Sequence, residues 1–232
     1  MEAIILAGGL GTRLQGVIGA YPKCMAPVNS KPFLAYIFDY LERQGCTRVV
    51  LSLGYKHEVV AEWLNKGSVN IPCSQVIESE PLGTGGGIQL ALGAAKDKNV
   101  VILNGDTFFD VDLQKMMDFH LKAESKTTLA LKQMREFERY GVVNMGANNI
   151  ILSFEEKKYR ATGLINGGVY IVDKEALLAK HLPQKFSFEK KYLERYVAEG
   201  NFCGYELDGY FIDIGIPEDY ARVKDDFKKM FS

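Results

Sequence analysis

The 232-residue sequence lacks a strong net charge, a long apolar run and clustered cysteines. Its 28 Lys and Arg residues nearly balance its 29 Asp and Glu residues, and the net charge of −1 gives no basic field that would favour nucleic acid or an anionic membrane. No run approaches the ~20 apolar residues of a membrane span, and the amino terminus runs into an apolar strand pattern rather than a signal peptide. We therefore expect a cytoplasmic protein that binds neither nucleic acid nor membrane.

Metal-binding and disulfide patterns are also missing. The four cysteines show no CxxC spacing and no paired histidines, which argues against a zinc site or a disulfide framework and favours reduced thiols. The three histidines, His57, His120 and His181, are scattered along the chain, so each is more simply a structural residue than a catalytic one.

Short apolar runs alternate with helical patterns in the first half of the chain. Runs rich in Val, Ile and Leu at residues 3–6, 48–53 and 99–103 are typical of parallel strands buried on both faces. Helical patterns lie at 32–44, 57–65 and 87–95, the first with Pro32 in its first turn and Gly45 past its end. This order predicts an α/β fold with helices on both faces of a parallel sheet.

The second half has a different pattern. Strands are predicted at 127–132, 141–144, 150–154 and 168–172, and helices at 174–180, 188–199 and 217–231. Few helices separate these strands, so we interpret this half as an antiparallel extension of the sheet that forms a lid or floor over a site. Without a linker or a repeat, we expect one domain, 1–232.

A glycine-rich turn directly follows the first predicted strand. Residues 8–14 read GGLGTRL, and Lys23 follows nearby. Glycines let backbone N–H groups approach an anion closely, and Arg13 and Lys23 would neutralise it. The turn is not a Walker A loop, because no Gly-Lys-Ser/Thr ends it, and Leu14 replaces the third glycine of a dinucleotide fingerprint. We interpret it as a phosphate site; a tight strand-to-helix turn is the alternative.

A second glycine-rich turn, PLGTGGG at 81–87, follows Glu78 and Glu80. Two such turns at strand ends would meet at the carboxyl edge of the sheet, where open α/β sheets bind ligands. Carboxylates only accept hydrogen bonds, so either glutamate would suit the N1–H and N2–H₂ donors of guanine. The alternative is that both are solvated loop residues.

Two aspartates are candidates for a metal site. Asp106 comes just after the third buried strand, and Asp213 lies among apolar residues beside Gly215. Mg²⁺ usually takes one or two carboxylates with phosphate oxygens and water, so one ion held by both would satisfy both. Polar groups at 140–141, 154–157 and 166–168 could bind sugar hydroxyls and a second phosphate.

Taken together, these motifs resemble the sugar-phosphate nucleotidyltransferases. They occur in that family's order: GGLGTRL at 8–14, PK at 22–23, PV at 27–28, PLGTGG at 81–86, NGD at 104–106, FEEK at 154–157, NGG at 166–168 and IDIGIPEDY at 212–220. Within the family the chain looks most like the D-glycero-α-D-manno-heptose 1-phosphate guanylyltransferases, through MAPV at 25–28, FSFEK at 186–190 and GYFIDIGIP at 209–217. Cys24 departs from the pattern, since Pro is common there.

The resemblance implies a Rossmann-like mixed sheet, with a nucleotide-binding half at 1–125 and a sugar-phosphate-binding half at 126–232. It implies transfer of GMP from GTP to a sugar 1-phosphate, with Mg²⁺ and release of pyrophosphate. Catalytic roles fall on Arg13, Lys23 and Asp106, and metal ligation on Asp106 and Asp213. The residues expected at the nucleotide are Leu6, Ala7, Gly8, Gly9, Gly11, Thr12, Arg13, Lys23, Glu78, Glu80, Pro81, Gly83 and Thr84. Those expected at the sugar phosphate are Asn104, Gly105, Tyr140, Gly141, Glu156, Lys157, Asn166 and Gly168.

Other readings of the sequence stay open. The sugar could be mannose 1-phosphate, and the nucleotide UTP or CTP. A non-catalytic nucleotide-sugar-binding subunit is disfavoured because Arg13, Lys23 and both aspartates are present. Aromatic helix faces such as 33–41 could be core or the interface of a homo-oligomer.

Overall fold

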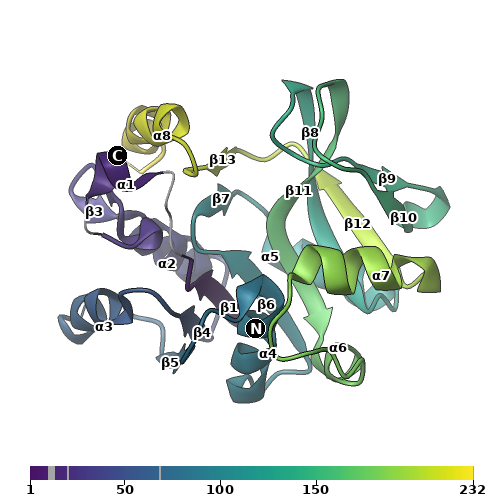
Figure 1. Ribbon diagram of the computed structural model, residues 1–232, viewed down its shortest axis with the longest axis horizontal. Coiled ribbons are helices and arrows are strands. Elements are labelled where there is room, and N and C mark those ends of the chain that lie inside the picture. The colour runs from purple at the N-terminus through teal and green to yellow at the C-terminus, as the bar shows by residue number, and fades with distance from the viewer. Residues whose placement is uncertain (10–13, 20, 68, 232) are drawn as a thin grey trace.

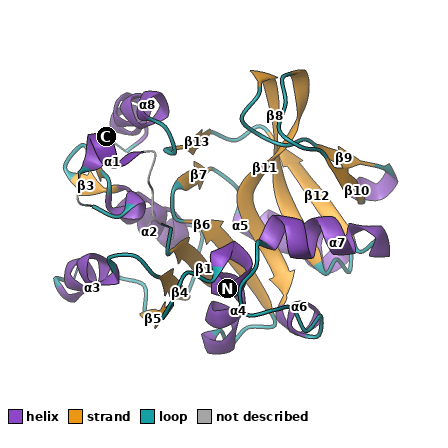
Figure 2. Ribbon diagram, in the orientation of Figure 1, coloured by secondary structure: helices purple, strands orange, loops and turns teal. Residues whose placement is uncertain are grey.

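The computed structural model describes residues 1–9, 14–19, 21–67 and 69–231. A mixed seven-stranded sheet crosses the molecule in the order β12-β8-β11-β6-β1-β4-β5 (Figure 1). Its strands are β1 (Glu2–Ala7), β4 (Arg48–Leu53), β5 (Cys73–Ile77), β6 (Asn99–Asn104), β8 (Thr127–Phe137), β11 (Arg160–Asp173) and β12 (Phe202–Leu207). β6, β1, β4 and β5 run parallel, β11 is antiparallel to both β6 and β8, and β12 is parallel to β8. This confirms the predicted mixed, mainly parallel sheet flanked by helices (Figure 2).

The helices cover both faces of this sheet. They are α1 (Gln15–Ile18), α2 (Phe33–Arg43), α3 (His57–Asn65), α4 (Gly83–Ala94), α5 (Leu113–Lys122), α6 (Lys174–Leu178), η4 (Glu189–Leu193), α7 (Glu194–Tyr196), η5 (Val197–Glu199) and α8 (Pro217–Met230). Two short segments, η2 (Lys23–Met25) and η3 (Ala147–Asn149), are 3₁₀ turns. Three antiparallel pairs complete the structure: β2 (Pro27–Val28) with β3 (Lys31–Pro32), β7 (Thr107–Phe109) with β13 (Phe211–Asp213), and β9 (Val143–Met145) with β10 (Ile151–Phe154).

Alternation along β1 shows how the sequence divides the core. Ala3 and Ile5 face a cluster formed with α2, α3, α5 and α8, while Ile4 faces a cluster formed with α4, α6 and the η4–η5 segment. Successive side chains of a strand point to opposite faces, so an uninterrupted apolar run serves both clusters. The aromatic face of α2 is buried within the single chain, which assigns it to the core. Among the described helices, none is long and apolar enough to cross a membrane.

Several elements differ from the sequence-based expectation. α4 begins at Gly83 instead of residue 87, and β8 and β11 are longer than the predicted 127–132 and 168–172 because both continue into half-exposed arms beyond the core. The segment 188–199, predicted as one helix, contains the π-helical η4, a turn of α-helix and the 3₁₀ turn η5. Neither α5 nor β12 was predicted, although Asp112 caps α5 by accepting a hydrogen bond from the Lys115 N–H.

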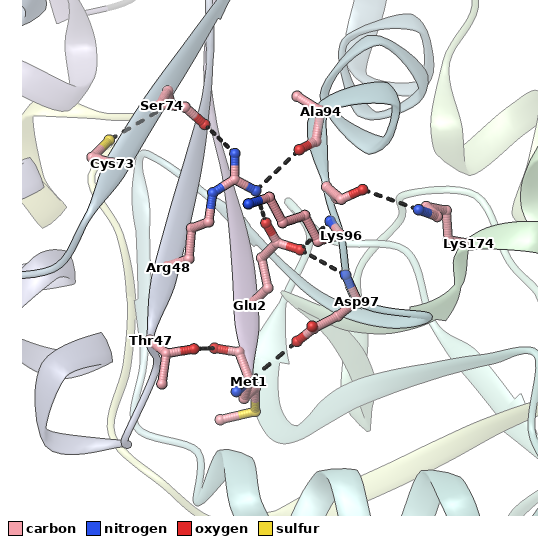
Figure 3. Close-up of polar contacts among 11 residues, drawn as sticks. Met1, Glu2, Thr47, Arg48, Cys73, Ser74, Ala94, Lys96, Asp97 and Lys174 are labelled. Carbon is pink, nitrogen blue, oxygen red and sulfur yellow. Dashed lines mark hydrogen bonds and ion pairs between the residues drawn. The ribbon is translucent and has the colours of Figure 1, made fainter.

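A buried ionic network joins the amino ends of β1 and β4 to the end of α4 (Figure 3). One oxygen of Glu2 pairs with the Arg48 guanidinium, and the other accepts hydrogen bonds from the Lys96 and Asp97 N–H groups at 2.6 and 2.9 Å. Arg48 also donates to the Ala94 carbonyl at 3.0 Å. Burial raises the pKa of Glu2, but these hydrogen bonds outweigh it and hold the pKa below its usual value. The network lies at the opposite end of the strands from the candidate site.

Candidate functional site

A cavity of about 300 Å³ opens at the carboxyl ends of β1, β4, β5 and β6. It is lined by Leu6, Gly8, Gly9, Ser52, Glu78, Pro81, Gly83, Thr84, Gly87, Asn104 and Asp106. Most of the predicted nucleotide residues therefore share this cavity. Glu80 is exposed and does not line it, and Gly11, Thr12 and Arg13 lie outside the described residues.

Glu78 is one of two acidic side chains in the cavity wall, with Asp106. Its Oε2 accepts a hydrogen bond from the Leu82 N–H at 2.9 Å. Its Oε1 lies so close to two glycines that an added Cβ would stand 2.9 Å away at Gly8 and 2.8 Å away at Gly87. These glycines thus make room for a carboxylate, a role that the sequence reasoning missed.

Ser52 also lines the cavity, and it was not predicted. It is almost fully buried near the end of β4, and its hydroxyl donates to the Gly87 carbonyl at 3.2 Å. The available signal was a single hydroxyl within the apolar run 48–53.

The second glycine-rich turn forms the first turn of a helix rather than an open loop. Gly83 has a φ of +74°, and a Cβ there would lie 2.6 Å from the Phe186 carbonyl oxygen. A Cβ at Gly85 would collide with the Phe186 ring. The Thr84 hydroxyl accepts a hydrogen bond from the Phe188 N–H at 3.0 Å. The glycines therefore let the 184–188 segment pack on α4, a role that the sequence did not predict.

Lys23 and the two aspartates converge beside this cavity. The Lys23 ammonium lies 2.6 Å from Asp106 Oδ2 and 3.3 Å from Asp213 Oδ1. Asp106 follows β6, and Asp213 ends β13, where the antiparallel pairing with β7 places it opposite Thr107. The Gly215 N–H donates to Asp213 Oδ1 at 2.8 Å and fixes that carboxylate.

Two carboxylates aimed at one cation form a donor set that fits a hard divalent ion. In the described part of the chain, no group of three or more His, Cys, Asp or Glu side chains is arranged to hold a metal. An ion at Asp106 and Asp213 would therefore complete its coordination with phosphate oxygens and water.

A second, smaller cavity of about 120 Å³ lies between β9, β10, β11 and η4. The predicted sugar-phosphate residues in its lining are Tyr140, Gly141, Glu156, Lys157 and Asn166. Glu189, Lys190 and Glu194 also line it and were not predicted as site residues, although Glu189 and Lys190 belong to the FSFEK motif that carries the resemblance.

Several groups at this second cavity are fixed by their neighbours. The Asn166 amide donates to the Tyr170 hydroxyl at 2.8 Å and accepts from the Gly168 N–H at 3.0 Å. Glu156 pairs with Lys190 at 3.1 Å, and a Cβ at Gly141 would collide with the Glu155 carbonyl. Since a side chain at position 141 would clash with the Glu155 carbonyl oxygen, this position requires glycine.

Gly168, within β11, and Gly105, just after β6, make close contacts with neighbouring strands. Gly168 has a φ of +74°, and a Cβ there would lie 2.6 Å from Asn104 Nδ2. The Gly105 N–H donates to the Leu6 carbonyl at 2.8 Å. Both glycines permit close backbone approach and do not themselves line either cavity.

The buried histidine is structural. The ring of His120 is hydrogen-bonded to the Thr128 hydroxyl at 2.8 Å and to Asn99 Oδ1 at 3.2 Å. Burial lowers its pKa to about 4, so the ring is neutral at pH 7. It lies outside both cavities.

The chain is similar to several known proteins over nearly its whole length. The chain is 50% identical over 224 residues to the D-glycero-α-D-manno-heptose 1-phosphate guanylyltransferase of Aneurinibacillus thermoaerophilus, covering 97% of each chain. It is 49% identical over 221 residues to the enzyme of that name from Campylobacter jejuni, covering 95% of this chain and 97% of the relative. The crystal structure of HddC from Yersinia pseudotuberculosis complexed with GMP-PN superposes with a TM-score of 0.87 at 37% identity, covering 97% of this chain and 99% of that one. Residues 2–230 match the model of the nucleotidyl transferase family, and the chain belongs to that family.

Proposed function

We propose that this chain transfers GMP from GTP to D-glycero-α-D-manno-heptose 1-phosphate, giving GDP-heptose and pyrophosphate. The observation that carries the proposal is the convergence of Lys23, Asp106 and Asp213 beside a cavity with a carboxylate wall. The names of the two bacterial relatives support the choice of sugar and base.

The guanine base would lie against Glu78. One carboxylate oxygen is already engaged by the Leu82 N–H, and Oε1 lies over Gly8 and Gly87 inside the cavity. A carboxylate can accept hydrogen bonds from guanine N1–H and N2–H₂, whereas uracil and cytosine do not present that pair of donors. This supports GTP over pyrimidine nucleotides.

The sugar phosphate would occupy the second cavity. Lys157 is exposed there and would meet the phosphate, while Glu156 and Asn166 would meet hydroxyl groups. Tyr140 adds a neutral hydroxyl, because burial raises the pKa of its phenol to about 12. The polar lining suits a hydroxyl-rich ligand.

The reaction needs positioning and positive charge more than a protein nucleophile. A sugar phosphate oxygen is already anionic near neutral pH, so its attack on the α-phosphorus of GTP requires no general base. A P–O bond forms to that oxygen as the bond to the pyrophosphate oxygen breaks, in line with the attack. Lys23 and Arg13 would orient the triphosphate and offset charge on the leaving pyrophosphate. Asp106 and Asp213 would hold Mg²⁺, which supplies positive charge to the phosphates when bound.

A substrate panel tests the proposal. GTP, UTP, CTP and dTTP are each paired with heptose, mannose and glucose 1-phosphates, and pyrophosphate release is measured. We expect GTP with the heptose phosphate to give the highest kcat/KM. Asp106→Asn should abolish most of this activity, and Asp118→Asn, at an exposed position on α5, is the matched control. If no pair of substrates releases pyrophosphate, the enzymatic function is rejected. If another pair is preferred, the substrates are reassigned.

A further inference from the structure

The Lys23 ammonium occupies the space between the two candidate metal ligands. Its distances of 2.6 Å to Asp106 and 3.3 Å to Asp213 are those of direct ion pairs. The Lys23 side chain is 15% exposed, whereas those of Asp106 and Asp213 are 39% and 30% exposed. The Lys23 side chain is therefore the most enclosed of the three.

The fold holds this amine in place. Lys23 begins η2, and the next two residues, Cys24 and Met25, are buried in the core beneath it. A Cβ at Gly215 would lie 3.1 Å from the Lys23 amine and 2.9 Å from Asp213 Oδ1, so a side chain there would press on the pair. The ammonium thus sits in a built position rather than on a freely moving surface side chain.

We propose that Lys23 is an internal stand-in for the divalent ion. In the nucleotide-free protein its ammonium pairs with Asp106 and Asp213, offsets part of their negative charge and competes with metal for them. The ion binds fully when Lys23 moves to the triphosphate. This inference rests on the proposed function, because it takes the two aspartates as the metal site.

Geometry makes the two occupants mutually exclusive. Mg²⁺–oxygen bonds are about 2.0–2.1 Å long, so an ion held by both carboxylates would take the place that the ammonium now fills. Two cations of total charge +3 would also repel each other strongly at such short range. The displaced ammonium has a ready partner in a triphosphate, which carries several negative charges. Metal binding and nucleotide binding are therefore coupled through one side chain.

Titration of the protein with Mn²⁺ alone tests this competition. Free Mn²⁺ is followed by electron paramagnetic resonance for the wild type and for Lys23→Met, which keeps an unbranched side chain one heavy atom shorter and removes its charge. We expect Lys23→Met to bind Mn²⁺ at least about tenfold more tightly than the wild type, since a neighbouring cation has been removed. Lys31→Met, which removes an exposed lysine paired with Asp39, is the matched control and should leave the affinity unchanged.

The double variant Lys23→Met/Asp106→Asn assigns any gain to this site. It should lose the tighter binding, because one of the two carboxylates is no longer charged. Affinity in Lys23→Met equal to or weaker than that of the wild type would overturn the proposal, as would a gain that persists in the double variant.

A second measurement uses only the wild-type protein and does not depend on the folding of a variant. Acetylation of individual lysines is quantified by mass spectrometry with and without saturating Mn²⁺, in the absence of nucleotide. Displacement of Lys23 predicts faster acetylation at Lys23 and an unchanged rate at Lys31. An unchanged or slower rate at Lys23 would contradict the displacement.

Neither measurement needs nucleotide or sugar phosphate. If the substrate panel shows no activity but Lys23→Met binds Mn²⁺ tightly, the proposed function is rejected and the competition between Lys23 and the metal is retained. An active substrate panel with unchanged Mn²⁺ affinity in Lys23→Met would support the proposed function and reject the competition between Lys23 and the metal.

Discussion

Replacement of Glu2 by glutamine should destabilise the protein through the buried ionic network of Figure 3. The Glu2 carboxylate only accepts hydrogen bonds, and it receives them from Arg48 on one oxygen and from the Lys96 and Asp97 N–H groups on the other. A glutamine amide has one oxygen and one NH₂ group. In either orientation its NH₂ donor faces another donor, so the new side chain cannot satisfy both sides.

The size of the effect follows from burial. Removing one partner of a buried ion pair costs about 3–5 kcal/mol, mainly because the remaining charge is left uncompensated. The Arg48 side chain is 25% exposed and keeps its hydrogen bonds to the Ala94 carbonyl and the Ser74 hydroxyl, so water and these bonds offset part of that cost. We expect the free energy of unfolding to fall by about 2–3 kcal/mol, within the range for hydrogen bonds to charged groups. For a chain of this size, this lowers Tm by roughly 5–10 °C.

Urea unfolding followed by circular dichroism at pH 7 measures this change. Glu62→Gln, in an exposed i,i+4 pair with Lys66 on α3, is the matched control and should change the unfolding free energy by no more than about 0.5 kcal/mol. The difference in unfolding free energy between the wild type and Glu2→Gln should reach its maximum above pH 4.5, the usual pKa of a glutamate. It should shrink as the pH falls through the lowered pKa of Glu2 in the folded protein. A loss below about 1 kcal/mol at pH 7 would refute the reasoning.

Four further changes test the site and the core. Arg13→Ala should reduce kcat for pyrophosphate release by roughly 10² or more with an unchanged circular dichroism spectrum, since one charge-stabilising donor is lost; near-normal turnover would reject that role. Glu78→Gln should erode the kcat/KM preference for GTP over UTP, and an unchanged ranking of triphosphates would exclude Glu78 as the reader of the base. Gly215→Ala should raise the Mg²⁺ concentration for half-maximal activity severalfold, because the new Cβ would lie 2.9 Å from Asp213 Oδ1; identical metal dependence would contradict this. Burial keeps His120 neutral in the folded protein, whereas the unfolded chain takes up the proton first, so the free energy of unfolding of the wild type should fall by up to about 3 kcal/mol as the pH falls from 6.5 to about 4. Urea titrations at several pH values should show a smaller loss for His120→Gln, and an equal loss would mean that another group causes the effect.

The strands buried on both faces were predictable from sequence almost to the residue. The run at 48–53 matches β4, and the runs at 3–6 and 99–103 each fall within one or two residues of β1 and β6. These strands need apolar residues on both sides, which gives an unbroken run. β8 and β11 extend past the core into half-exposed arms, where polar residues interrupt the pattern, and their lengths could not be predicted from periodicity.

The site was only partly accessible to the same reasoning. Asp106 follows a clear buried strand, so its place at the sheet edge can be inferred from the sequence. The glycines at 83–86 look like a phosphate loop, but their neighbours come from residues 184–186, about 100 positions away along the chain. Close approach between distant segments leaves no local signal. The FSFEK motif at 186–190 pointed to the family, but not to a place for Glu189 and Lys190 at the second cavity.

Asp213 shows why the site depends on tertiary structure near the end of the chain. β13 is three residues long, and its pairing with β7 brings Asp213 to Asp106. The helix that follows is anchored by Phe227, whose ring lies 5.8 Å from that of Phe33 and 4.7 Å from that of Tyr36 on α2. β13 is therefore held by its pairing with β7 on one side and by the helix that follows it on the other. Because α8 directly follows the loop that carries Asp213 and Gly215, its packing on α2 helps to fix the position of that carboxylate.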